Sequence, residues 1–129
     1  MVRQVIDVDG KWKVVVWYDA NWRYWKLIER DLIWIGASRE HLEALYRDMR
    51  RDKVKAVTCS NIRMRKSVVL FKRHRDVRDF INSVVHEAEH VKQTMLKGYK
   101  VEDSGEPPAY TIGYLVGEMW KVFRRGVCI

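Results

Sequence analysis

The most regular apolar pattern in the chain lies between Asp76 and Gly98. Apolar residues recur there at the three- and four-residue intervals of an amphipathic helix: Val77, Phe80, Ile81, Val84, Ala88, Val91 and Met95. The segment contains no proline, and Gly98 is the type of residue at which helices often end. The pattern therefore predicts a helix over residues 76–98.

The N-terminal third of the chain alternates short apolar runs with turn residues, which is typical of strands. Four such runs occur, at residues 5–8, 12–18, 22–29 and 32–35. Asp9-Gly10 favours a tight hairpin turn between the first two. We interpret residues 1–36 as a Trp-rich meander of three or four strands. Its five tryptophans are expected in the sheet core, with a stacking platform for nucleic-acid bases as the alternative: Trp12, Trp17, Trp22, Trp25 and Trp34.

Residues 38–72 are predicted to form one helix and two strands. Ser38 is a suitable N-cap for a helix over residues 39–51. Strands are expected at residues 54–60 and 67–72, and the uninterrupted apolar run in the second indicates a central strand. Pro107-Pro108 favours the start of a last helix, which is expected to reach about residue 124.

These elements predict an α+β fold in a single domain of residues 1–129. The expected sheet is rich in antiparallel strands, one helix lies between the strands, and two helices fall within residues 75–124. At 129 residues and 47% apolar content the chain can form one hydrophobic core. It has no apolar run long enough for a transmembrane helix and no apolar segment of a signal peptide near Met1. Cys59 and Cys128 are isolated, so we expect a reduced, cytoplasmic protein.

The net charge of +8 is concentrated in one segment. Residues 47–78 contain twelve Lys and Arg but only three Asp, a local charge of +9. Such a segment attracts nucleic acid or an acidic partner, although it is equally typical of a solvated surface. The candidate nucleic-acid contacts are Arg63, Arg65, Lys66, Arg73 and Arg75.

The predicted helix over residues 76–98 contains the motif H-E-x-x-H, at His86-Glu87-Ala88-Glu89-His90. On a helix, His86 and His90 project from one face and can both reach a single zinc ion. Glu87 points about 100° away from His86, so it is expected to act as a general base rather than as a ligand. The alternative interpretation is a solvated helix face without a metal.

A catalytic zinc site usually has three protein ligands and a water. The acidic candidates after the motif are Glu102, Asp103, Glu106 and Glu118. We favour Glu106, with Asp103 next, because of a small-residue stripe on the last predicted helix: Ala109, Gly113 and Gly117. Glu106 lies on the same face, and such a stripe would let the motif helix cross closely there. The alternative is that the stripe serves packing alone and Glu106 only caps the helix.

Two segments together resemble small phage and prophage proteins. They are the motif at residues 85–90 and Glu106-Pro107-Pro108-Ala109-Tyr110-Thr111-Ile112-Gly113-Tyr114-Leu115. Those proteins carry H-E-A-x-H followed by E-x-x-A-Y-x-x-G-Y-L, and they are similar to minimal gluzincins. The E-x-x-A-x pattern at residues 106–110 also resembles the corresponding helix of ImmA/IrrE-type peptidases. The resemblance covers the last third to half of the chain. It implies a zincin-like domain with Zn²⁺ at His86, His90 and Glu106, Glu87 as base, and a phage- or prophage-encoded protein in the host cell.

The expected activity is zinc-dependent hydrolysis of peptide bonds. Zinc lowers the pKa of bound water from about 15.7 towards 7, and Glu87 would pass the proton to the leaving amine. Tyr110, Tyr114 and His74 are open alternatives for stabilising the oxyanion. Two other classes of function remain: a non-catalytic zincin-like binding protein, and a nucleic-acid-associated protein that uses residues 47–78.

Overall fold

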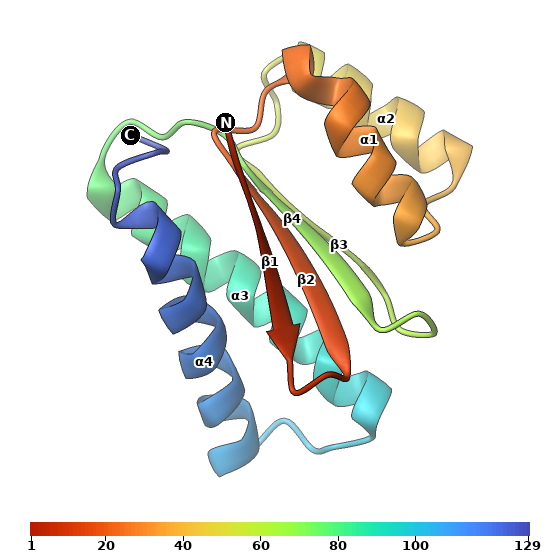
Figure 1. Cartoon of the computed structure of the whole chain (residues 1–129), viewed down its shortest axis with the longest axis vertical. Coiled ribbons are helices and arrows are strands. Elements are labelled where there is room, and N and C mark those ends of the chain that lie inside the picture. The colour runs from red at the N-terminus through yellow and green to blue at the C-terminus, as the bar shows by residue number, and fades with distance from the viewer.

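The computed structural model describes all 129 residues. A four-stranded mixed sheet forms the centre of the protein, and Figure 1 shows its position between the helices. Its strands are β1 (Val2–Val8), β2 (Trp12–Tyr18), β3 (Ala56–Asn61) and β4 (Lys66–Phe71), in the order β1-β2-β4-β3. β1 and β3 pair antiparallel with their neighbours, whereas β2 and β4 are parallel. The predicted α+β class and the central position of β4 are confirmed.

Helices cover both faces of this sheet (Figure 1). A short 3-10 helix, η1 (Trp22–Tyr24), is followed by α1 (Trp25–Trp34), α2 (Arg39–Arg50), α3 (Val77–Tyr99) and α4 (Glu106–Phe123). α1 and α2 pack on one face, and α3 and α4 pack on the other. None of these helices combines the length and hydropathy needed to cross a membrane.

The predicted N-terminal meander is wrong after its first hairpin. Residues 22–34 form η1 and α1, so two helices rather than one separate β2 from β3. Ile28 and Leu32 lie one helical turn apart and are both fully buried against the sheet. Burial of this stripe outweighs the preference of aromatic and β-branched residues for strands.

The motif helix forms close to its predicted bounds. Asp76 caps its start, with its carboxylate accepting a hydrogen bond from the Asp79 amide at 2.8 Å. Gly98 does not end the helix, which continues to Tyr99. Its role is close packing, because a Cβ at this position would lie 3.0 Å from the buried Trp12 ring.

The small-residue stripe of α4 does not serve a close helix crossing. Ala109, Gly113 and Gly117 are exposed, and a Cβ at either glycine would meet no atom within 4 Å. α4 instead packs through a different set of residues: Leu115, Met119, Val122 and Phe123. The predicted close crossing of the motif helix at this stripe, for which Glu106 was favoured as a metal ligand, is therefore wrong.

Candidate metal centre

The two motif histidines face each other on the exposed surface of α3. Their Nε2 atoms are 3.1 Å apart. Zinc–imidazole bonds of about 2.0–2.1 Å to both atoms would enclose an angle of about 100°, close to tetrahedral. The contact is a hydrogen bond in the tautomer in which one Nε2 carries a proton, and when both imidazoles carry their proton on Nδ1 both Nε2 atoms are free to act as ligands. The spacing of the two Nε2 atoms would therefore allow both to bind one divalent ion.

Glu87 lies beside this pair rather than in it. Its side chain lies against β3, and the residue is only 5% exposed. One carboxylate oxygen, Oε1, accepts a hydrogen bond from Thr58 Oγ1 at 2.9 Å, and the other, Oε2, lies 3.9 Å from His86 Nε2. A buried carboxylate at this distance can receive a proton from a water bound near the histidines.

A cleft of about 520 Å³ contains all three motif residues and runs between α3 and β3. β3 is an edge strand that pairs only with β4, so its outer backbone groups are free. Thr58 and Ser60 project from β3 into the cleft, and Thr94 joins them from α3. Sequence reasoning missed these residues, although alternation along residues 56–61 places Thr58 and Ser60 on one face.

Glu106 is not brought to the histidines. α4 runs beside β1, where the Tyr114 hydroxyl donates to the Asp7 carbonyl at 3.1 Å, and β1 is the sheet edge opposite β3. Asp103, the second candidate, forms an ion pair with Lys92 at 2.9 Å. No three His, Cys, Asp or Glu side chains are grouped as metal ligands. Of the three predicted ligands, the structure brings His86 and His90 together and leaves Glu106 apart from them.

The three residues considered for the oxyanion lie elsewhere. Tyr110 is 79% exposed on the outer face of α4, and Tyr114 is bonded to β1. His74 is buried between the Lys72 carbonyl at 2.7 Å and the Ser83 hydroxyl at 2.8 Å. None of them lines the cleft, so the structure does not bring them to the motif residues.

The predicted nucleic-acid patch is divided by β4. Arg63, Arg65 and Lys66 lie at one end of this strand, while Arg73 and Arg75 follow the other end. A six-residue strand separates two such groups by about 20 Å.

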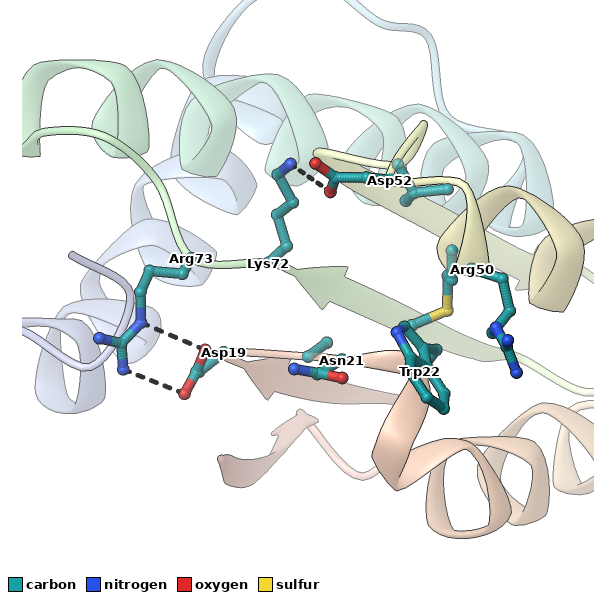
Figure 2. A pocket seen from close by; sticks show the side chains of 10 residues that line it. Asp19, Asn21, Trp22, Arg50, Asp52, Lys72 and Arg73 are labelled. Carbon is teal, nitrogen blue, oxygen red and sulfur yellow. Dashed lines mark hydrogen bonds and ion pairs between the residues drawn. The ribbon is translucent and has the colours of Figure 1, made fainter.

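Acidic residues neutralise part of the Arg73 end. Lys72 pairs with Asp52 at 2.6 Å and Arg73 pairs with Asp19 at 3.2 Å. These residues line a cavity of about 310 Å³, and both pairs are marked in Figure 2. The nearby Trp22 ring is covered by Arg50, whose Cζ lies 4.2 Å from the ring centroid. Trp12 and Trp17 are core residues, as predicted. At this end two of the cations are therefore paired with aspartates, and one face of the Trp22 ring is occupied by Arg50.

Comparison of the chain with protein-family models, with curated proteins and with solved structures gives no match.

Proposed function

We propose that the chain is a zincin-like hydrolase that cleaves peptide bonds with a zinc ion at His86 and His90 and with Glu87 as general base. One observation carries the proposal. The two Nε2 atoms lie 3.1 Å apart, and the Glu87 carboxylate lies 3.9 Å from one of them in the same cleft. Two ligands and an adjacent base from a single helical turn are the parts that metal-assisted hydrolysis requires.

The position of β3 supports an extended peptide as substrate. The free edge of β3 borders the cleft and can pair with an added strand through backbone hydrogen bonds. A peptide bound in this way passes over His86, Glu87 and His90. The cleft has polar side chains and no deep apolar pocket, which favours recognition of the peptide backbone over recognition of one side chain.

A bound zinc ion supplies the Lewis acid that activates water and polarises the scissile carbonyl. Glu87 takes the proton from the attacking water and returns it to the leaving amine. Thr58 holds one oxygen of this carboxylate and leaves the other free toward His86. His86 and His90 would hold the ion, which is one protein ligand fewer than catalytic zinc sites usually have.

The test is metal content, measured by elemental mass spectrometry on protein purified without a metal-affinity tag and supplied with zinc. We expect about one zinc per chain in the wild type, almost none in His90→Ala, and an unchanged content in Glu106→Ala. Zinc lost from Glu106→Ala would instead assign Glu106 as the third ligand and require α4 to move. Absence of zinc from the wild type would reject the proposal.

Nucleic-acid binding has less support than hydrolysis. The basic residues form two groups separated by β4, and Lys55, Lys72 and Arg73 each pair with an aspartate. A zincin-like protein that binds zinc without turnover would give the same zinc contents in these variants and show no peptide cleavage.

A further inference from the structure

A second cavity has a volume of about 650 Å³ and lies among the β1–β2 turn, the end of α3 and the start of α4. These three segments meet at one end of the sheet, which is the lower end in Figure 1. This cavity shares no residue with the cleft at His86 and His90. Its volume is within the range of small-molecule sites, about 300–1,000 Å³. The cavity is therefore large enough to bind a ligand independently of the candidate metal centre.

The inner wall of this cavity is apolar and contains one unsatisfied polar atom. Met95 and Leu96 are almost completely buried there. The hydroxyl of Tyr99, which also lines the cavity, is buried and has no hydrogen-bond partner. Burial raises the pKa of this hydroxyl, so it remains a donor. Unsatisfied buried polar groups are rare in folded proteins, and a ligand acceptor would satisfy this one.

The rim of the cavity is predominantly cationic. Lys11, Arg65 and Lys100 line it, against a single carboxylate, that of Asp9. The Arg65 guanidinium lies over the Tyr99 ring, with its Cζ 5.2 Å from the ring centroid. An anionic group bound at this rim would meet several donors next to the apolar wall.

Two of these cations occupy backbone conformations that disfavour them. Arg65 and Lys100 have φ values of 54° and 58°, in the left-handed region where glycine and asparagine are preferred. Lys100 directly follows α3, a position at which glycine is the usual residue. Cationic side chains at both positions reduce stability relative to glycine, which is consistent with a role for their charge at the cavity.

We infer that this cavity binds a small carboxylate with a flat apolar body. The body would lie against Met95 and Leu96, and the carboxylate would lie among Lys11, Arg65 and Lys100 with the Tyr99 hydroxyl as an additional donor. This inference does not depend on the proposed hydrolase activity.

The experiment is a titration of isotope-labelled full-length protein followed by amide NMR, with 2-naphthoate as the probe and the neutral 2-naphthamide as its matched control. We expect 2-naphthoate at about 1 mM to shift amide resonances of residues 95–101 and the β1–β2 turn. The amide should bind at least about tenfold more weakly because it lacks the charge. His90→Ala should bind 2-naphthoate as the wild type does, which separates this site from the candidate metal centre.

Three variants remove the proposed polar contacts to the carboxylate one at a time, and each is chosen so that the protein still folds. Tyr99→Phe, Arg65→Gly and Lys100→Gly should each weaken 2-naphthoate binding several-fold, while their melting temperatures stay the same or rise. Asp52→Gly is the matched control, because Asp52 also has a positive φ, 55°, but lies at the other end of the sheet. It should bind 2-naphthoate with unchanged affinity.

Three results would overturn the inference. They are no shift of these resonances at about 1 mM 2-naphthoate, equal binding of the acid and the amide, and wild-type affinity in all three cavity variants. Equal binding of the acid and the amide would indicate contact with an apolar surface only.

Discussion

The Thr58 hydroxyl donates a hydrogen bond to the Glu87 carboxylate, with 2.9 Å between Thr58 Oγ1 and Glu87 Oε1. Thr58 belongs to the edge strand β3 and Glu87 to the motif helix α3, so this bond connects the two walls of the cleft. The strand proposed to bind the peptide thus also orients the proposed base. A substitution at Thr58 is expected to affect Glu87 without contacting either histidine.

We predict that Thr58→Val lowers the free energy of unfolding by about 1–3 kcal/mol, because the buried carboxylate loses its donor while the side-chain shape is nearly conserved. Thr58→Ser retains the hydroxyl and should cost less. Urea denaturation of the two variants measures the difference. Equal destabilisation by valine and serine would mean that the methyl group, and not the hydrogen bond, is what matters at this position.

We predict that Glu87→Gln abolishes most hydrolysis and retains the metal. Glutamine is nearly isosteric but cannot accept a proton, and loss of a general base typically slows a reaction about 10²–10⁴-fold. The assay is cleavage of a mixed library of fluorogenic peptides, with zinc content measured on the same samples. If this variant loses its zinc, Glu87 is a ligand and the role assigned to it is wrong.

A third prediction concerns Asp31, which holds α1 against the sheet. Its carboxylate accepts from the Trp17 indole at 2.8 Å and from two nitrogens of Arg3 at 2.8 and 2.9 Å. Asp31→Ala leaves the buried indole N–H unpaired and should lower the free energy of unfolding by about 2 kcal/mol. This loss is smaller than the loss expected on breaking a fully buried ion pair, because Arg3 is partly exposed. Thermal and urea unfolding measure this, and Asp31→Asn, which keeps an acceptor, should cost less. A loss below about 0.5 kcal/mol would show that apolar burial alone positions α1.

These Asp31 contacts also explain why α1 could not be predicted from local sequence. The segment contains Trp25, Ile28, Ile33 and Trp34, all residues of high strand propensity. Its helical state depends on burial of Ile28 and Leu32 against the sheet, together with a partner on β1 and another on β2. Elsewhere local signals were sufficient: periodicity for α2 and α3, Pro107-Pro108 for the start of α4, the Asp9-Gly10 turn for the first hairpin and an uninterrupted apolar run for β4.

The candidate site was predictable only in the part that lies within one helix. His86, Glu87 and His90 have relative positions determined by helix geometry, so their spacing in the sequence was enough. Thr58 comes from a strand far away in the chain, and nothing local joins it to Glu87. Glu106 was misplaced because helical periodicity tells which residues share a face of α4 but not which neighbour that face meets.

A pH dependence of stability is predicted from His74. Burial, with Lys55 and Lys72 nearby, lowers the pKa of His74 below its usual value of 6.5. The folded state therefore keeps this imidazole neutral at pH values where the unfolded chain takes up a proton. Stability is fully present above about pH 6.5 and decreases as pH falls below it, by up to about 1.4 kcal/mol per pH unit until the folded-state pKa is reached.

The measurement for His74 is the free energy of unfolding in urea from pH 7.5 to pH 5. His74→Gln can retain hydrogen bonds to the Lys72 carbonyl and the Ser83 hydroxyl but does not titrate, so its stability should change less over this range. An identical slope in wild type and variant would assign the dependence to other groups.

The two cysteines are predicted to be unreactive in the folded protein. Burial raises the pKa of Cys59 to about 11, with a further contribution from the Glu87 charge, and burial also raises the pKa of Cys128 to about 11. Neutral thiols with 8% and 0% exposure neither ionise nor meet a reagent at pH 8. Iodoacetamide should therefore modify neither thiol in native buffer and both in urea, as measured by mass spectrometry of the intact chain.

Modification of either thiol in native buffer would report local opening of the segment around it. Cys128 lies in the C-terminal segment, where its carbonyl accepts from the His74 amide at 2.6 Å, and Cys59 lies on edge strand β3. Fast native labelling of Cys59 alone would show that β3 separates from α2, and in that case the strand proposed to bind substrate is mobile in the absence of peptide.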